Sequence, residues 1–263
     1  MSDQIPNSES RPVSGFSKLA LKGIGSVILT QGAQESLVIE ADPDIRSRIR
    51  SEVIDGTLTI SYDFDLISDV FGLRFIDASP IRYHVSMINV NGISNSGAGT
   101  IHAGPIQSEA FELNLSGAGS VDLQSVTAQS TTVSLSGAGS IDLHAITAQS
   151  MAISLSGAGS IKIQKVDVSK TTATLGGAGS IRIESGKAND QQVRLSGVGS
   201  YEAGNVECQT AGVRVAGAGS AAVWVKETLD ASLNSVGSIN YYGTPRVTSQ
   251  ITGLGKLNNL GNK

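Results

Sequence analysis

The sequence predicts an all-β chain that folds as a right-handed parallel β-helix, a solenoid with coils of about 20 residues. Three observations support this prediction: a glycine-containing phrase that recurs, apolar and polar residues that alternate on both sides of it, and a composition poor in aromatic and charged residues. The first sets the period, the second sets the type of element, and the third fits a thin aliphatic core.

A seven-residue phrase recurs at a fixed interval along most of the chain. It is Leu-Ser-Gly-Ala-Gly-Ser-Val at 115–121, and it ends in Ile at 135–141 and 155–161. Its second glycine recurs every 20 residues and then twice after 18, at positions 99, 119, 139, 159, 179, 199, 219, 237 and 255. Such a period is typical of a solenoid, in which each repeat buries its apolar face only against its neighbours.

The residues that flank the phrase predict strands rather than helices. Val133 and Leu135 precede one glycine corner, Ile141 and Leu143 follow it, and polar or small residues stand between them. Period two is the mark of a half-buried strand. Two strands therefore flank each corner, and a third segment such as 145–148 closes the coil. The right hand rests on the general chirality of parallel crossovers.

Equivalent side chains of successive coils are expected to stack in ladders about 4.8 Å apart. Two inward ladders are Leu115, Leu135, Leu155, Leu175, Leu195, Val215, Leu233 and Ile251, and Val121, Ile141, Ile161, Ile181, Tyr201, Ala221, Ile239 and Leu257. The corner glycines are expected to supply backbone angles that a Cβ disfavours and to allow close approach of the coils. Between them, Ala118, Ala138, Ala158 and Ala178 are expected to point inward.

Composition excludes several classes of protein. Of 263 residues, 4% are aromatic and 16% charged, and the net charge of −4 offers no electrostatic case for binding nucleic acid. No run approaches 18 apolar residues, so no membrane-spanning helix is expected. Cys208 is the only cysteine, which rules out an internal disulfide.

Four segments are predicted along the chain. Residues 1–14 form a flexible leader, 15–90 an N-terminal β region with the opening coils, 91–257 the regular repeats, and 258–263 a polar tail. Within the second segment, 63–80 breaks the pattern and carries three of the five phenylalanines. It is expected to be a loop packed over the open end of the stack, with a partner-binding or self-association surface as the alternative.

Shorter elements are predicted within 15–90. Asp55-Gly56 lies between two apolar runs and predicts the turn of a hairpin. Asp42-Pro43-Asp44 predicts a turn, followed by a short helix through Ile45, Arg46 and Ile49.

Asp122 and Asp142 are the residues weighed for catalysis. They begin an outward ladder that continues with Lys162, Arg182, Glu202 and Ala222. Two carboxyl groups about 4.8 Å apart approach the separation found in retaining glycosidases. The favoured interpretation is a solvated face on which Asp142 pairs with Lys162 and Arg182 with Glu202. No catalytic residue is therefore predicted.

The histidines, the cysteine and the glycine phrase predict no cofactor or metal site. His84, His102 and His144 are scattered, and Cys208 has no histidine in its own coil. The glycine phrase lacks the Lys-Ser/Thr ending of a phosphate loop. Ile181 stands where a calcium-binding nonapeptide has aspartate.

The chain resembles the head GIN domain, or autotransporter adhesin, family of Bacteroidetes-type bacteria. The matching residues are Phe16 with Gly-Ile-Gly-Ser-Val at 23–27, the segments 37–42 and 55–60, and the Ser-Gly-Ala-Gly-Ser repeats, over roughly 15–240. The resemblance implies a right-handed β-helix exported to the periplasm or cell surface, and it carries over no catalytic residues. No secretory signal is visible in the first residues.

The resulting prediction is a non-enzymatic cell-surface or periplasmic β-helix that binds a glycan or a surface protein through its outward ladders and the 63–80 loop. One alternative is a carbohydrate-active β-helix, a glycan hydrolase or lyase, that uses Asp122 and Asp142. Another is a self-assembling scaffold, a homo-oligomer joined through the ends of the helix or the 63–80 loop.

Overall fold

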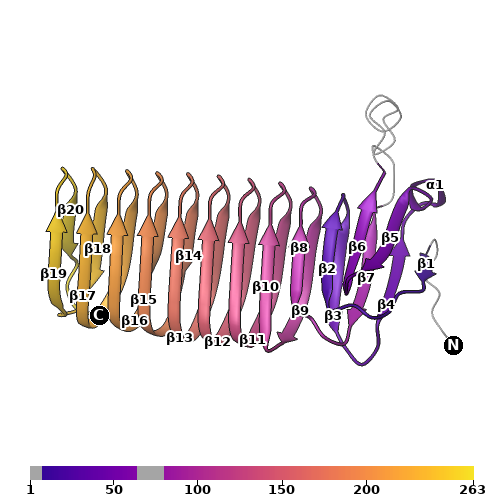
Figure 1. The fold of residues 1–263 in the computed structure, drawn as a ribbon, viewed down its shortest axis with the longest axis horizontal. Coiled ribbons are helices and arrows are strands. Elements are labelled where there is room, and N and C mark those ends of the chain that lie inside the picture. Colours follow the sequence, from indigo (N-terminus) through magenta and orange to yellow (C-terminus); the bar gives the residue numbers. More distant parts are fainter. Residues whose placement is uncertain (1–7, 64–79) are drawn as a thin grey trace.

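The computed structural model describes residues 8–63 and 80–263, which form an elongated β-solenoid (Figure 1). Its strands are stacked along a single axis, with β1 near one end and β20 at the other. One short helix, α1 (Pro43–Arg46), occurs in this part of the chain. The predicted all-β solenoid is confirmed, while the right hand of the coil stays a prediction.

The regular coils are parallel strands stacked in register. Val121 lies opposite Ile141 and Leu135 opposite Leu155, so one turn of the solenoid contains 20 residues, as the period of the sequence predicted. The strands are β8 (Gly92–Asn95), β9 (Thr100–Gln107), β10 (Ala110–Leu115), β11 (Ser120–Leu135), β12 (Ser140–Leu155), β13 (Ser160–Leu175), β14 (Ser180–Ile183), β15 (Gly186–Leu195), β16 (Ser200–Val215) and β17 (Ser220–Leu233).

Each regular coil has three faces. The strand β11 is continuous, but Gln124 and Gln129 have no register partner in β12, and the alternation of buried and exposed residues changes phase at both points. The backbone therefore bends there, while the glycine phrase makes the third corner. Residues 120–123, 125–128 and 130–135 form the faces, in agreement with the predicted closing segment.

Close approach explains the corner glycines. A Cβ on Gly137 would lie 2.0 Å from the carbonyl oxygen of Gly117 in the preceding coil, a distance that no side chain tolerates. Among the glycines of the repeated corners, positive φ occurs at Gly25 alone. The expectation that these corners in general need unusual backbone angles is therefore wrong, and the expectation of close approach is correct.

The alanines between the corner glycines face solvent. Ala118, Ala138, Ala158 and Ala178 are exposed, so the prediction that they point inward is wrong. The second glycine of each phrase is buried instead, as Gly139 shows. Its missing side chain leaves room for the leucine of the preceding coil, since a Cβ there would lie 3.0 Å from Cδ2 of Leu115.

The core is a set of stacked apolar ladders along the axis. Leu135, Leu155, Ile141 and Ile161 are buried, as predicted. A further inward ladder mixes polar with apolar residues: Phe111, Thr131, Met151, Thr171, Gln191, Ala211 and Leu229. Burial of aliphatic side chains at about 25 cal/mol per Å² is the main stabilising contribution in such a thin core.

The first coils do not stack in chain order. The strands β2 (Lys18–Lys22) and β3 (Ser26–Gln31) lie between the layer of β6 (Thr57–Tyr62) and β7 (Arg82–Met87) on one side and β8 and β9 on the other. Leu19 thus pairs with both Leu58 and Ile93. The variant of the repeat at residues 23–27 therefore forms the corner of a stacked coil between β2 and β3. The strand at 82–87, β7, lies in the adjacent layer on the N-terminal side of that coil.

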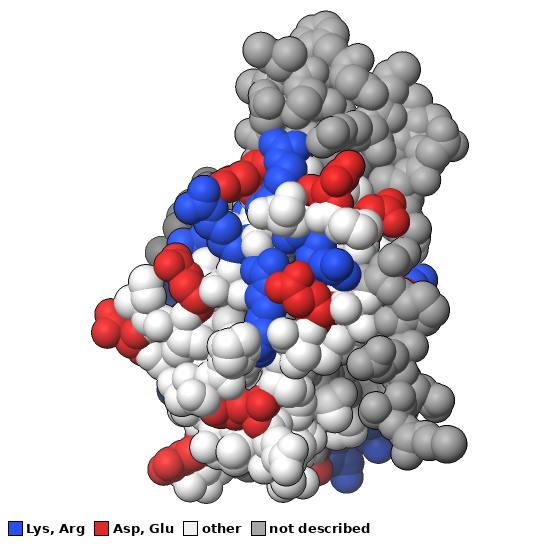
Figure 2. Space-filling model, turned by 90° about the vertical axis from the view of Figure 1, so that its right-hand side faces the viewer, with Lys and Arg blue, Asp and Glu red and all other residues white. Residues whose placement is uncertain are grey.

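Antiparallel strands close the N-terminal end. The strand β4 (Ser36–Glu40) pairs with β7 and with β1 (Ser8–Arg11), and β5 (Ile49–Ile54) pairs with β6 in the predicted hairpin. Figure 2 views this end, where acidic and basic side chains are interspersed. The flexible leader predicted for 1–14 is wrong for residues 8–11, which form β1.

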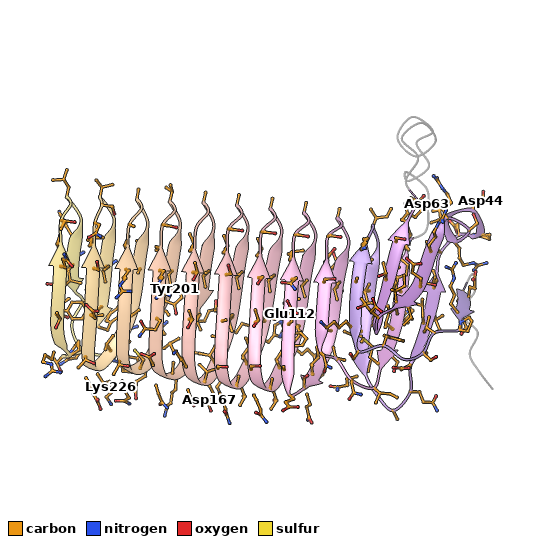
Figure 3. The ribbon with its side chains drawn as sticks, in the orientation of Figure 1. Asp44, Asp63, Glu112, Asp167, Tyr201 and Lys226 are labelled. Atoms are coloured by element: carbon orange, nitrogen blue, oxygen red, sulfur yellow. The ribbon has the colours of Figure 1, made fainter. Side chains whose placement is uncertain are left out.

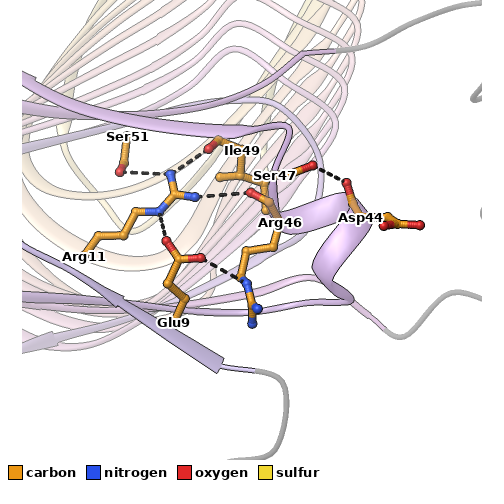
Figure 4. A network of polar contacts seen from close by, with 7 residues as sticks. All are labelled: Glu9, Arg11, Asp44, Arg46, Ser47, Ile49 and Ser51. Carbon is orange, nitrogen blue, oxygen red and sulfur yellow. Dashed lines mark hydrogen bonds and ion pairs between the residues drawn. The ribbon is translucent and has the colours of Figure 1, made fainter.

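A network of polar contacts holds β1 against α1 and β5 (Figure 4). The guanidinium of Arg11 donates to the carbonyl oxygens of Ile49 at 2.6 Å and of Arg46 at 3.2 Å. Glu9 forms ion pairs with Arg11 and with Arg46, each at 3.0 Å. These contacts provide hydrogen-bond donors for the carbonyl oxygens of Ile49 and Arg46 at the covered end of the stack, whereas Nη1 of Arg46 is buried without a hydrogen-bond partner among the described residues.

The C-terminal end is open. The coils shorten to 18 residues through two register shifts between β16 and β17. The last strands are β18 (Ser238–Tyr242), β19 (Arg246–Ile251) and β20 (Lys256–Asn259), and β19 and β20 each pair on one side only. Ile251, placed inward by the sequence, is 44% exposed because no coil covers it. The loop predicted at 63–80 lies almost wholly outside the described residues.

Candidate functional site

Asp122 lies between two histidines on the outer surface of the solenoid. Its Oδ1 is 3.1 Å from Nε2 of His144 in the next coil, and its Oδ2 is 3.8 Å from Nδ1 of His102 in the preceding coil. The side chains of Asp122 and His144 are 47% and 44% exposed. The register of β9, β11 and β12 brings these groups together, since His102 and Asp122 are direct partners. The periodic pattern of the sequence did not predict this arrangement.

The remaining charges of this face form contacts between neighbouring coils. Nε2 of Gln164 donates to Asp142 at 3.4 Å, and Lys162 forms an ion pair with Glu184 at 3.3 Å. The predicted pair of Asp142 with Lys162 is therefore wrong, because Lys162 turns toward the following coil. Arg182 and Glu202 do form the predicted ion pair.

Asp122 and Asp142 are register partners on adjacent strands, as the ladder predicted. Asp142 accepts a hydrogen bond from Gln164, Asp122 lies at ion-pair distance from His144, and both carboxylates are on the outer surface. Exposed pairs of this kind contribute about 0–1 kcal/mol. Within residues 8–63 and 80–263, no group of three or more His, Cys, Asp or Glu is placed to hold a metal ion.

A polar cluster surrounds the buried side chain of Tyr201, which is labelled in Figure 3. The hydroxyl of Tyr201 donates to Oε1 of Gln191 at 3.0 Å, and the thiol of Cys208 donates to the carbonyl oxygen of Trp224 at 3.2 Å. Burial, and secondarily the charge of Asp190, raises the pKa of Cys208 to about 12. Burial also raises the pKa of Tyr201 well above its ordinary value. A thiol so protonated is a poor nucleophile.

An open groove rich in amide side chains crosses four coils near the N-terminal third of the stack. We call it the amide groove; its lining includes Asn89, Asn91, Gln107, Ser108, Glu109, Phe111, Glu112, Gln129, Ser130, Thr132, Gln149 and Ser150. Its volume is about 850 Å³. Gln129 and Gln149 are exposed, and neither side chain hydrogen-bonds another described residue. Amides both donate and accept hydrogen bonds, which suits ligands rich in hydroxyl groups.

The glycine corners form a second, shallower groove along the stack. Small residues line it in every coil from Ala98 to Ser220. Within it, the hydroxyl of Ser120 donates to that of Thr100 at 3.1 Å. This groove offers repeated methyl and hydroxyl groups but no charged or aromatic side chain. Its geometry follows from the close approach of the glycines and needs no ligand to explain it.

Sequence reasoning missed the amide groove. Gln129 and Gln149 recur at the coil period and are visible in the sequence, but their neighbours come from other segments. Asn89, Asn91 and Gln107 reach the same surface because β9 and β10 pair with β11, and β8 pairs with β10. None of the helices in the described part of the chain is both long and apolar enough to cross a membrane.

Comparison with known proteins supports the fold and the family. A crystal structure of a protein named a putative adhesin, from Parabacteroides distasonis, has a TM-score of 0.73 at 17% identity and covers 96% of both chains. Another, named a putative lipid binding protein from the same organism, has a TM-score of 0.71 at 19% identity and covers 97% of both. A putative adhesin from Bacteroides fragilis has a TM-score of 0.59 at 24% identity and covers 96% of both. At these identities the likeness concerns the fold.

No curated protein matches the chain. One family model matches it in two overlapping segments, residues 15–185 and 144–245, and thus spans both the covered end and the regular coils. The resemblance identified from the glycine repeats and the opening segment is confirmed. The chain belongs to the family described as "putative auto-transporter adhesin, head GIN domain".

Proposed function

We propose that this protein is a non-enzymatic adhesin of the cell surface or periplasm, and that it binds glycans through the amide groove. The groove itself carries the proposal. Gln129 and Gln149 present unsatisfied amides from successive coils, beside Asn91 and the hydroxyl of Ser130. A polar, open groove with fixed spacing along a rigid stack suits an extended chain of hydroxylated units.

The stack supports this role mechanically. Successive coils share backbone hydrogen bonds along their length, so the strand residues of the groove, among them Gln129 and Gln149, are held by the stack. Asn89, Asn91, Ser108 and Glu109 lie in the connections between strands. Rigid elements position binding groups at low entropic cost. The family description, which names an adhesin, agrees with the same role.

Binding to an array of glycans, with an array of surface proteins beside it, tests the proposal. A double variant, Gln129→Ala with Gln149→Ala, should lose about 10-fold or more in affinity for a glycan that the wild type binds, because two hydrogen-bonding amides are removed. Thr127→Ala with Thr147→Ala is the matched control, since these exposed side chains lie on the same coils outside the groove.

Two results would reject the glycan assignment. One is an array with no glycan bound above background; the other is equal binding by the groove variant and the control. If the protein binds a surface protein but no glycan, it is still an adhesin, and its ligand is a surface protein rather than a glycan.

Self-assembly is a second candidate, favoured by the open C-terminal end. The strands β19 and β20 present unpaired edges there, and Leu254 is 86% exposed. Unpaired edges can add strands from another chain. Light scattering over a concentration series would show growth in mass for a scaffold and a constant mass for a monomeric adhesin. By contrast, the paired carboxylates Asp122 and Asp142 give the carbohydrate-active alternative no feature beyond their spacing.

A further inference from the structure

A pocket near the C-terminal end lies outside the amide groove and is built around an aromatic ring. Its volume is about 470 Å³, and its lining includes Arg182, Glu202, Gly204, Asn205, Asn240, Tyr242 and Lys263. It opens where the outward ladders change from long side chains to Gly204 and Ala222. A Cβ on Gly204 would lie 3.0 Å from Cε2 of Tyr242, so the ring rests directly on that glycine.

The ammonium group of Lys263 lies against one wall of this pocket and makes three contacts there. Its Nζ lies 3.9 Å from the centroid of the Tyr242 ring. It donates to the carbonyl oxygen of Gly204 at 2.7 Å and to Oδ1 of Asn205. No Asp or Glu among the described residues forms an ion pair with it. Glu184 and Glu202 also line the pocket, but they form ion pairs with Lys162 and Arg182. The ammonium group is therefore held by a ring face and two neutral oxygens.

The pocket walls depend on residues other than Lys263. Tyr242 is held in β18 by register with Trp224 in β17, and Gly204 and Asn205 belong to β16. Backbone bonds from Leu260 to Tyr241 and from Gly243 to Gly261 place the segment that carries Lys263 beside the pocket. The occupant and the receptor are thus separate parts of the chain.

We propose that this pocket is a binding site for a primary ammonium group of the lysine type, occupied in the structure by the chain's own Lys263. The external ligand that fits it is a lysine side chain on a partner protein, which enters when Lys263 leaves. A tethered occupant competes at an effective concentration that reaches millimolar values for short tethers. The ring face and the two oxygens that Lys263 contacts are therefore available to an external ammonium group only when Lys263 is displaced, although the rest of the pocket is open. The proposal is independent of glycan binding at the amide groove.

Trp224 provides the readout. It is the only tryptophan, and it lies in register with Tyr242 on the adjacent strand. Titration with n-butylammonium, a mimic of the lysine side chain, should change the Trp224 emission of a Lys263→Gln variant and saturate in the millimolar range. The wild type and a Lys256→Gln control, which retain Lys263, should need at least about 10-fold more ligand.

Variants of the ring separate recognition from folding. In the Lys263→Gln background, Tyr242→Phe keeps the aromatic face and should retain binding within about 3-fold, whereas Tyr242→Leu should lose it by about 10-fold or more. Circular dichroism and unfolding curves establish that each variant is folded, and proton shifts of the Tyr242 ring in NMR spectra provide a second measurement.

Three results would overturn the proposal: no saturable response of folded Lys263→Gln, equal affinity in wild type and Lys263→Gln, or equal affinity in the Phe and Leu variants. A saturable response to methyl glucoside that n-butylammonium does not reduce would also overturn it, in favour of a sugar site. Loss of glycan binding at the amide groove has no bearing on these outcomes.

Discussion

The carboxylate of Asp122 shares a contact of 3.1 Å with the imidazole of His144, one coil further along the solenoid. The contact crosses the stack at an angle, since the register partner of Asp122 is Asp142. Gln164 reaches Asp142 and Glu184 reaches Lys162 with the same offset. Outward side chains of this solenoid therefore interact between coils. The charged groups are spread over the surface and do not gather in a pocket.

Replacing both carboxylates should leave the fold intact. Asp122→Asn with Asp142→Asn is expected to change the free energy of unfolding by less than about 1 kcal/mol, because exposed polar pairs contribute little. Denaturant unfolding of the double variant beside the wild type measures this. A glycan-cleaving activity present in the wild type and lost in this folded variant would support the carbohydrate-active alternative instead.

Truncation within the leucine ladder should be costly. Leu155→Ala is expected to lower the free energy of unfolding by about 2–5 kcal/mol, because Leu155 is buried between Leu135 and Leu175 and the cavity cannot collapse. Ser156→Ala is the control on the adjacent exposed position. If the two variants unfold at the same denaturant concentration, the core ladder is wrongly placed.

The corner glycines and alanines should differ sharply in their tolerance of substitution. In Gly157→Ala the new Cβ would meet the carbonyl oxygen of Gly137 at 1.9 Å, so the coils must separate. We expect a loss of about 1–3 kcal/mol or a failure to fold. Ala158→Ser, one residue later on the exposed side, should leave thermal stability unchanged. Equal tolerance at both positions would contradict the observed packing of the corners.

Alkaline pH should destabilise the fold through Cys208. Its pKa is raised from 9.0 to about 12 in the folded state by burial. Above about pH 9 the unfolded chain releases the thiol proton while the folded chain retains it, so stability is full below that pH and falls as pH rises toward 12. The slope approaches about 1.4 kcal/mol per pH unit for one such group. Tyr201, whose pKa is also raised, adds to the fall above its ordinary range.

Denaturant unfolding of wild type and Cys208→Val at several alkaline pH values checks this expectation. The variant should show a shallower decline just above about pH 9, because Tyr201 remains and Cys208 does not. Parallel declines in the two proteins would mean that the thiol ionises equally in both states.

Removing Arg11 should loosen the covered N-terminal end. Arg11→Ala leaves the carbonyl oxygens of Ile49 and Arg46 without this donor and is expected to cost about 1–3 kcal/mol. Hydrogen exchange should become faster in β1 and at the β4 edge that pairs with it, and remain slow in β12. Arg50→Ala, whose side chain is 74% exposed, is the control. Unchanged exchange in β1 would show that backbone pairing alone holds it.

Local sequence pattern determined much of the fold, and packing decided the rest. Period two and the 20-residue repeat predicted the strands, the pitch and most of the buried ladders, because each coil contacts neighbours with the same pattern. The exposed side of Ala138 was not predictable in this way, since a corner has no alternation and small residues fit either side. The amide groove also required the stacking order, because its residues come from several strands.

The sequence by itself determined that this chain is a β-solenoid of the head GIN domain family. The reason is that each repeat contacts only the adjacent repeats, so the contacts can be predicted from the repeated pattern. Tertiary structure alone placed β2 and β3 between layers that follow them in the chain, set Lys162 on Glu184 rather than Asp142, and brought Lys263 to Tyr242. The physical reason is that side-chain partners across coils depend on rotamer, register shift and chain path, which no periodic pattern encodes.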